Sequence, residues 1–355
     1  MKIMVTKIFF LSTGIDKLGK SGLVLFERLN QYAKKLAEIS DHNYKLVVLV
    51  FTRNKLFAIP KAHSNLEFVI INKSHFFLKN IFNLYFHLKK MKVNFSNTGF
   101  VLSNFYADFI YLLFLEFREK RKLKFQIALH GNSEFTETKN IFKRQAKKFF
   151  FKSATAKATS VRVVNEYEAK KLKFKGVQAV LSPIPIRIPD LSLKPNPTLI
   201  GFVGRFHHER GVENWIEIAD CVYKQNTDSA YLVVGEGSLA YKFEKWIGSK
   251  LNSNRFRLMG FQDWENLNRV FGQLSLLLST AVEESYGQAI REAMCAGVKV
   301  VAFSNSTTED LKEKFPKLID TFNNSTEAVS LVLRNLLPPF NRRDEEYLQQ
   351  IQDFR

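Results

Sequence analysis

The chain has 355 residues, more than one ordinary domain of about 100–200 residues holds, so we expect two domains. Its 46% apolar and 25% charged residues exclude a disordered chain, and its two cysteines, Cys221 and Cys295, exclude a disulfide framework or a Cys-rich zinc site. The net charge of +19 is uneven, because residues 1–190 hold 34 Lys and Arg against 13 Asp and Glu (+21), whereas residues 191–355 hold 19 against 21 (−2). A basic half suits an anionic membrane surface or nucleic acid; a general bias toward lysine is the alternative, although it leaves the second half unexplained.

The first half alternates apolar runs with helical patterns. Most of the runs are continuous, as in strands covered on both faces, and Leu23–Ile39 has apolar residues at helical spacing between the first two. This order predicts βαβ units and a doubly wound parallel sheet. The predicted strands are Lys7–Ser12, Leu46–Phe51, Leu66–Ile71, Gly99–Ser103, Phe125–Leu129, Val161–Val164 and Ala179–Leu181.

The longest apolar stretch, Phe105–Phe117, contains Asp108 and Glu116 and is shorter than the roughly 18–20 residues that cross a bilayer. The run Ile8–Leu11 is too short for the core of a signal peptide and predicts a buried strand. We therefore expect no membrane span and no targeting segment, while binding to a membrane surface stays possible.

A domain boundary is predicted by five prolines in the stretch Ser182–Thr198, which can form neither a helix nor a central strand. The net charge changes at the same place. We expect an N-terminal domain over 1–185, a linker over 186–197, a C-terminal domain over 198–337 and a tail or short helix over 338–355.

The second half repeats the βα order. This order predicts two Rossmann-like α/β domains that face each other across a cleft. Ligands are expected to bind beyond the carboxyl ends of the strands. The predicted strands are Leu199–Val203, Tyr231–Val234, Phe256–Met259, Leu274–Leu278 and Lys299–Phe303; the helices begin at Val212 or cover Ala240–Gly248, Asn266–Phe271 and Gly287–Ala296.

Gly204 ends a predicted strand, and Arg205 and Arg210 follow it just before a helix. Helix N-terminal amides and two fixed guanidinium groups favour a diphosphate site, although a surface turn with two ordinary arginines is as good a reading. Gly235–Ser238 follows the next strand and by itself indicates only a tight turn.

Two glutamates lie around a predicted helix. Glu284 precedes it, beside Tyr286 and Gly287 at its N-terminus, and Glu292 lies inside it among apolar residues. A carboxylate in such a place needs a hydrogen-bond donor, which a ribose diol or a buried Arg partner would supply equally well.

In the first half, His130 follows a strand, which is compatible with a structural or a functional role. The loop Gly14–Gly22 matches the spacing of a phosphate-binding loop, but no acidic magnesium partner follows a strand, so we do not favour an ATPase.

Four motifs of the second half occur in a fixed order: G-R-x-x-x-x-[KR]-G at Gly204–Gly211, G-E-G at Gly235–Gly237, Gly260-Phe261, and E-S-Y-G-x-x-x-x-E-A-M-x-A-G at Glu284–Gly297. In order and spacing they resemble glycosyltransferase family 4, retaining enzymes of the GT-B fold. The N-terminal half resembles the family only through its glycine loop and His130-Gly131.

The resemblance implies a role for each charged position. Arg205 and Arg210 would hold the diphosphate of a nucleotide-sugar donor, with Arg210 standing where the family usually has Lys. Glu292 would accept from the ribose hydroxyls, and Glu284 would contact hydroxyls of the transferred sugar.

It also implies contacts for other positions. Backbone amides at Tyr286 and Gly287 would meet the diphosphate or the sugar, and His130 would touch the sugar from the opposite domain and stabilise the reacting centre. The other positions implied near the donor are Gly19, Gly22, Gly204 and Gly235 beside the phosphates or the sugar, and Gly260 and Phe261 beside the base.

Transfer would leave a nucleoside diphosphate, whose growing negative charge two arginines and a helix N-terminus can stabilise. We therefore expect no cofactor and no metal, in keeping with the absence of an Asp-x-Asp motif from the sequence. The family retains anomeric configuration, so neither glutamate is assigned as a nucleophile. UDP is favoured by family frequency alone.

The acceptor domain of this family is the N-terminal one, which here carries the basic charge. Lys73–Lys92 and Thr138–Lys157 mix Lys with aromatic residues at helical spacing, which suits an anionic membrane or, alternatively, packed helices with solvated lysines. We expect a cytoplasmic enzyme, peripheral on the inner face of the membrane, that acts on a glycan or lipid-linked acceptor in surface polysaccharide or lipopolysaccharide synthesis.

Three rival interpretations stay open. A sugar-nucleotide 2-epimerase of the same fold would bind the same donor, but would not need a basic, aromatic first domain. A non-catalytic nucleic-acid binder would use that basic half, but no RNA-binding motif is found and we expect no nucleic-acid partner. An inactive glycosyltransferase is disfavoured by the intact arginines and glutamates.

Overall fold

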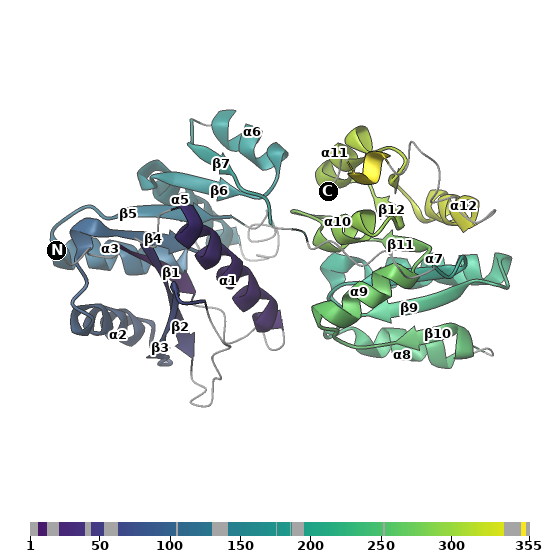
Figure 1. Ribbon diagram of the computed structural model, residues 1–355, viewed down its shortest axis with the longest axis horizontal. Coiled ribbons are helices and arrows are strands. Elements are labelled where there is room, and N and C mark those ends of the chain that lie inside the picture. Colours follow the sequence, from purple (N-terminus) through teal and green to yellow (C-terminus); the bar gives the residue numbers. More distant parts are fainter. Residues whose placement is uncertain are drawn as a thin grey trace. The chain divides into compact units, whose positions relative to one another are not determined.

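The computed structural model divides the chain into two compact units, an N-terminal unit over Met1–Pro183 and a C-terminal unit over Ile184–Arg355. Each unit is a parallel β-sheet with helices packed on it (Figure 1). The residues that the structure describes are 6–12, 21–39, 44–52, 63–103, 106–129, 141–174, 176–184, 186, 195–250, 253–336 and 349–352.

The N-terminal sheet has seven described strands, all parallel, in the order β3-β2-β1-β4-β5-β6-β7. The order reverses between β1 and β4, as in a doubly wound sheet. The strands are β1 Thr6–Ser12, β2 Tyr44–Thr52, β3 Leu66–Asn72, β4 Thr98–Leu102, β5 Lys124–Ala128, β6 Ser160–Val163 and β7 Ala179–Leu181.

Helices cover both faces of this sheet. Successive side chains of a strand point to opposite faces, so Phe9 and Val47 pack with one core cluster while Phe10 and Val48 pack with another. The second cluster is covered by α1, and the first by α2, α3, α5 and α6. The helices are α1 Ser21–Ile39, α2 Phe77–Lys90, α3 Ala107–Glu119, α5 Ile141–Lys157 and α6 Glu166–Phe174, with a 3-10 turn, η2, at Phe95–Asn97.

The C-terminal sheet has six described strands, also parallel, in the order β10-β9-β8-β11-β12-β13. Here too the order reverses, between β8 and β11, and that switch point is where open α/β sheets bind ligands. The strands are β8 Leu199–Val203, β9 Ala230–Val234, β10 Phe256–Leu258, β11 Leu276–Ser279, β12 Lys299–Phe303 and β13 Ile319–Phe322.

Its helices again form two layers. Trp215 of α7 lies in the cluster on one face with α8 and α12, and Ile290 of α10 lies in the cluster on the other face with α9 and α11. The helices are α7 Val212–Gln225, α8 Ala240–Gly248, α9 Trp264–Gln273, α10 Gln288–Cys295, α11 Ser306–Lys314 and α12 Ser325–Leu336, with 3-10 turns η3 His208–Arg210 and η4 Ser253–Arg255.

The strands predicted from apolar runs agree closely with the observed ones, because strands covered on both faces are apolar throughout. In β2, seven consecutive residues are buried. The predicted start of β11 at Leu274 is wrong, since the N–H of Leu274 donates to the carbonyls of Val270 and Phe271 and closes the end of α9.

The last described residues, 349–352, are helical and pack on the C-terminal unit. Ile351 is buried in the cluster under α10 and α11, and Gln350 Oε1 accepts from the N–H of Lys317 at 3.0 Å. These residues therefore contribute to the core of the C-terminal unit.

The stretch Phe105–Phe117 belongs mostly to α3, whose residues Phe109, Leu112 and Leu115 are buried against the N-terminal sheet. Within the described ranges, no helix is both long enough and apolar enough to cross a bilayer.

Candidate functional site

Three glycine turns meet at the carboxyl edge of the C-terminal sheet. The N–H of Gly204 donates to Val234 O at 3.0 Å, and the N–H of Gly235 donates to Gly260 O at 2.8 Å, so the turns after β8, β9 and β10 are joined by backbone bonds. Gly235 has φ +145°, and a Cβ there would lie 1.8 Å from the carbonyl oxygen of Gly204. Backbone packing between turns therefore requires glycine at this position.

Gly260 differs from Gly235. Its φ is +64°, which favours glycine, but a Cβ there would meet no atom within 4 Å. The neighbouring Phe261 is half-buried. The third turn thus has open space beside Gly260, the position at which the resemblance implies a base.

The turn that carries Arg210 is fixed to the end of β11. Gly211 has φ +63°, and a Cβ there would lie 2.2 Å from Thr280 O. The buried Thr280 hydroxyl donates to Gly211 O at 2.8 Å and to Arg210 O at 3.1 Å. Thr280 was not identified from the sequence; its position two residues beyond a predicted strand is the only signal there.

Arg210 and Glu284, 74 positions apart, form an ion pair between Arg210 Nη1 and Glu284 Oε1. Both side chains are mostly buried, with 29% of Arg210 and 10% of Glu284 exposed. Burial raises the pKa of Glu284, while the charges of Arg210 and Arg205 and the N–H of Gly287 act to lower it. From the sequence, a buried Glu–Arg pair was considered for Glu292, whereas the pair found here joins Arg210 to Glu284.

One N–H donor of the Arg210 side chain has no hydrogen bond. Nε of Arg210 is buried and has no hydrogen-bond partner among the described residues. A buried guanidinium N–H without an acceptor is costly, so this atom is an unmet donor within the pair.

Arg205 lies on a more open side of the same turn. Its guanidinium pairs with Glu209 and is 58% exposed, and its charge reaches Glu284. The two predicted diphosphate-binding arginines are thus both near the Glu284 carboxylate, with which Arg210 pairs, while Arg205 pairs with Glu209.

The loop of Glu284 is held from α11. The Thr307 hydroxyl donates to Glu284 O at 2.6 Å, and Asn305 Nδ2 donates to Ala281 O at 3.3 Å. Asn305 also caps α11 by accepting from the N–H groups of Thr307 and Thr308. These supporting residues precede and begin a helix that the sequence analysis did not predict.

Tyr286 connects this loop to Ile184, the first residue of the C-terminal unit. Its buried hydroxyl donates to Ile184 O at 2.8 Å, and its ring lies 4.4 Å from the guanidinium carbon of Arg291. Arg291 Nε also donates to Tyr286 O at 2.8 Å. The side chain of Tyr286 therefore has a positioning role that the sequence did not indicate.

Gly287 and Glu292 lie on the helix side of the loop. Gly287 has φ +67° and precedes α10, and its N–H interacts with the Glu284 carboxylate. Glu292 is 5% exposed and accepts from Gln288 Nε2 at 2.7 Å. Gln288 thus supplies a donor for the carboxylate to which the resemblance assigns a ribose.

The remaining candidates belong to the N-terminal unit. His130 and Gly19 lie outside the described residues, and Gly22 is the second residue of α1. In the part of the chain that is described, no group of three or more His, Cys, Asp and Glu side chains is placed to hold a metal ion.

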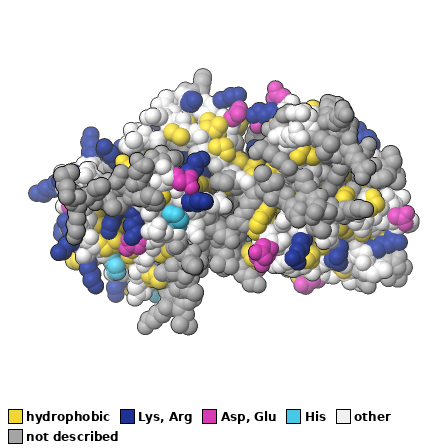
Figure 2. Space-filling model, viewed as in Figure 1, with side chains coloured by type: hydrophobic (Ala, Val, Ile, Leu, Met, Phe, Trp, Pro, Cys, Tyr) yellow, Lys and Arg dark blue, Asp and Glu magenta, His cyan; other side chains and the backbone are white. Residues whose placement is uncertain are grey.

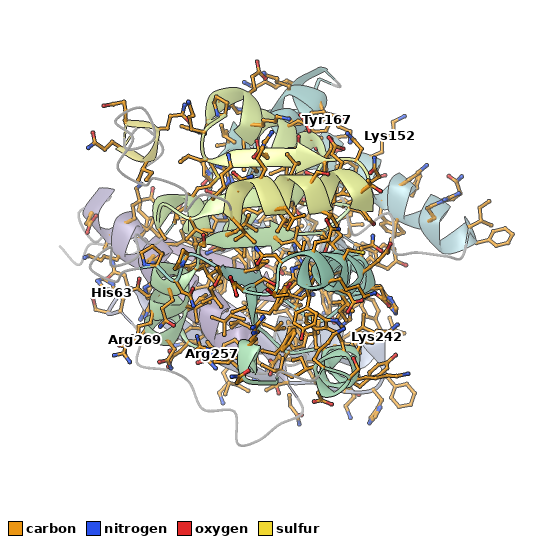
Figure 3. All side chains as sticks on the ribbon, turned by 90° about the vertical axis from the view of Figure 1, so that its right-hand side faces the viewer. His63, Lys152, Tyr167, Lys242, Arg257 and Arg269 are labelled. Carbon is orange, nitrogen blue, oxygen red and sulfur yellow. The ribbon has the colours of Figure 1, made fainter. Side chains whose placement is uncertain are left out.

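The exposed arginines of the C-terminal unit contrast with Arg210. The labelled side chains of Arg257, on β10, and Arg269, on α9, lie at the periphery in Figure 3, and both are exposed. They are suitable controls for the loss of one cation from this unit.

Comparison with known sequences finds a match for the C-terminal unit. Residues 185–337 match the family model described as "Glycosyl transferases group 1". A 2-deoxystreptamine glucosyltransferase from Streptomyces kanamyceticus is 32% identical over 105 residues, which are 30% of this chain and 27% of that protein. The chain thus aligns with less than a third of this curated relative.

Solved structures match nearly the whole length of the chain. A sucrose-phosphate synthase from Thermosynechococcus elongatus has a TM-score of 0.72 at 13% identity and covers 98% of this chain and 94% of its own. Anabaena HepE, solved with UDP and glucose, has a TM-score of 0.70 at 15% identity and covers 98% and 95%. With two parallel Rossmann-like sheets, the chain has the GT-B fold, as the sequence predicted.

Proposed function

We propose that the protein is a metal-independent, retaining glycosyltransferase of family 4, which transfers a hexose from a nucleoside diphosphate sugar to a glycan or lipid-linked acceptor. The observation that carries this proposal is the Arg210–Glu284 pair at the switch point of the C-terminal sheet, inside the segment that matches group 1 glycosyl transferases. A buried cation beside a carboxylate suits a ligand that combines a diphosphate with sugar hydroxyls.

The arginines would stabilise the leaving diphosphate. As the sugar–phosphate bond breaks, negative charge grows on the phosphate oxygens, and cations already fixed in place lower the barrier. Arg210 is fixed through Thr280 and has an unbonded Nε, and Arg205 is exposed on the same turn. We assign both to the diphosphate, which makes a metal unnecessary.

The carboxylates would recognise hydroxyl groups. Glu284 would accept hydrogen bonds from the transferred sugar and Glu292 from the ribose. Backbone atoms close to the donor would come from Gly204, Gly235, Tyr286 and Gly287. We assign no covalent step to either glutamate, and propose that the acceptor attacks from the face the diphosphate leaves. His130 would stabilise the reacting centre.

We propose UDP as the nucleotide. Support comes from the family resemblance and from HepE, a protein of this fold solved with UDP and glucose. Gly260, beside which the structure leaves open space, and Phe261 would lie beside the base.

We place the enzyme in the cytoplasm, at the inner face of the membrane, in surface polysaccharide or lipopolysaccharide synthesis. The support is the charge of the N-terminal unit, whose residues 1–183 hold 33 Lys and Arg against 12 Asp and Glu. A positive unit is attracted to anionic lipids and to phosphorylated, lipid-linked acceptors.

A thermal-shift panel of UDP, GDP, ADP, CMP and several UDP-sugars, with a chelator present, tests the donor site. A ligand at 100 times its dissociation constant should add about 2.7 kcal/mol of stability. We expect a shift with UDP and UDP-sugars that Arg210→Ala removes and Arg257→Ala leaves intact. A shift that requires metal, or none with any nucleotide, would contradict the proposal. Conversion of a UDP-sugar to its epimer without acceptor would indicate an epimerase instead.

A further inference from the structure

Helix α2 is apolar on two opposite faces. Asn80, Ile81, Leu84 and Leu88 form its buried face on the N-terminal sheet. A helix that borders only water on its other side carries polar residues there. On α2 the opposite side instead carries Leu78, Phe82 and Phe86, spaced four residues apart.

These outward side chains are well exposed. The exposed fractions are 68% for Leu78, 46% for Phe82 and 64% for Phe86, and Phe76, just before the helix, is 76% exposed. Spacing of four residues places them along one line of the helix surface. Single exposed apolar residues are ordinary, but a continuous apolar stripe marks a surface that contacts something other than water.

Helix α3 extends this stripe. The rings of Phe82 and Phe114 lie 5.2 Å apart, edge to face, and one turn beyond Phe114 the side chain of Phe117 is 78% exposed. Lys89 of α2 and Glu119 of α3 form an ion pair at 2.8 Å. The two helices therefore present one firmly positioned surface, which we call the α2–α3 surface.

The α2–α3 surface is also basic. Lys79, Lys89 and Lys90 are exposed on the outer side of α2, and Arg118 and Lys120 are exposed at the end of α3. Figure 2 shows apolar and basic side chains together in the region where Figure 1 draws α2. Aromatic rings between cationic side chains are the composition of helices that lie in the headgroup region of anionic membranes.

We propose that the α2–α3 surface docks on an anionic lipid bilayer, with Leu78, Phe82 and Phe86 in the interface and Lys79 and Lys90 at the headgroups. This deepens the proposed function by naming the surface that would bring the enzyme to a lipid-linked acceptor; binding to lipid does not itself require the transferase activity. Long lysine side chains reach headgroups while their stems lie on the apolar stripe.

The charge of the α2–α3 surface favours an anionic bilayer over a second copy of the chain or a nucleic acid. A second copy would bring two units of net charge +21 together, which is repulsive. Nucleic acid would match the lysines, but it stacks on aromatic rings and leaves an aliphatic residue such as Leu78 without a role. An anionic bilayer matches both the lysines and the complete apolar stripe.

Sedimentation of the full chain with vesicles tests this proposal. We expect binding to vesicles of phosphatidylcholine with phosphatidylglycerol, and little binding to phosphatidylcholine alone. Leu78→Ser, Phe82→Ser and Phe86→Ser together should weaken the binding by roughly tenfold or more. Lys79→Gln and Lys90→Gln should weaken it about fivefold each, because each lysine near such a surface contributes about 1 kcal/mol.

The comparison helix is α5, which lies in the other segment that the sequence marks as suited to an anionic membrane; its Phe142 and Phe149 are 82% and 68% exposed, and Figure 3 labels Lys152 of the same helix. Phe142→Ser with Phe149→Ser should leave most binding intact. Equal losses in both variants, no binding of the natural chain, or a dimer or RNA complex abolished by the α2 changes would overturn the proposal.

The UDP thermal shift separates the two proposals. Each α2 variant should keep the shift of the natural chain, which shows that it is folded. If the natural chain binds vesicles but no nucleotide, the transferase proposal fails and the docking surface stands; if it binds UDP but no vesicles, the docking surface fails alone.

Discussion

The two units have the same architecture but distribute their charge and apolar surface differently. The C-terminal unit is nearly neutral and buries charges in pairs: Arg210 with Glu284, and Lys299, 6% exposed, with Asp320 at 3.3 Å. The N-terminal unit is strongly positive and exposes an apolar stripe on α2. This difference is what the two proposals require, in which the C-terminal unit binds a small charged donor and the N-terminal unit docks on a membrane.

Arg210 gives the sharpest test of the enclosed site. Arg210→Ala leaves Glu284 buried without its cation, which typically costs 3–5 kcal/mol, so we expect about that loss of unfolding free energy. The substitution also removes a fixed positive charge that would stabilise the leaving diphosphate, so donor turnover should fall by about 100-fold or more. Urea unfolding and turnover of a UDP-sugar measure the two effects.

A double substitution separates stability from function. Arg210→Met with Glu284→Gln removes both charges, so stability should largely return while turnover stays low. Arg257→Ala, at the periphery of the same unit, should change neither quantity. Full turnover in Arg210→Ala would remove this residue from the site.

Three glycine-to-alanine substitutions compare the stability of turns in the C-terminal unit with that of a strand in the N-terminal unit. In Gly235→Ala the new methyl would lie 1.8 Å from Gly204 O at φ +145°, so we expect a loss of several kcal/mol, comparable with other severe backbone conflicts. Gly260→Ala, in open space at φ +64°, should cost only about 1 kcal/mol.

Gly99 in β4 of the N-terminal unit has free space and no positive φ, so Gly99→Ala should be neutral or slightly stabilising. Thermal unfolding of the three variants measures this order. Equal stability of the Gly235 and Gly99 variants would show that the turns of the C-terminal unit are not closely packed.

The acid sensitivity of the C-terminal unit should depend on Asp220. Hydrogen bonds from Lys250, Lys224 and Trp246 outweigh the effect of burial and lower the pKa of Asp220 to about 2. A lowered carboxyl pKa stabilises the fold above the ordinary value of 3.8, and that stabilisation is lost as pH falls from about 4 to 2.

We therefore expect Asp220→Asn to lose about 2 kcal/mol relative to the natural chain at pH 7 and much less at pH 2.5. Urea unfolding of both proteins across this pH range measures the difference. A difference independent of pH would contradict the assignment to charge.

Tyr286→Phe should lower stability while leaving donor binding nearly unchanged. It leaves Ile184 O, buried at 7% exposure, without its donor, at a cost of about 1–3 kcal/mol, while the ring contact with Arg291 is kept. UDP affinity should change little. A large loss of UDP affinity with normal stability would mean that the hydroxyl contacts the donor directly.

The site shows how far sequence reasoning reached. The glycine turns and both arginines were identified from strand ends and motifs, because these signals are local. The pairing of Arg210 with Glu284 joins residues 74 positions apart, and Thr280, Thr307 and Tyr286 support it through hydrogen bonds between separate elements. No local pattern contains such contacts, so the sequence did not pair Arg210 with Glu284.

The sequence by itself determined the parallel α/β organisation, since strands covered on both faces are apolar throughout, and it located the change of charge between the halves. Only the tertiary structure decided which side of α2 is buried. Ile81, Leu84 and Leu88 repeat at helical spacing, and so do Leu78, Phe82 and Phe86. Either line could pack on a sheet; the packing of α2 against β3 and α3 buries the first and leaves the second facing outward.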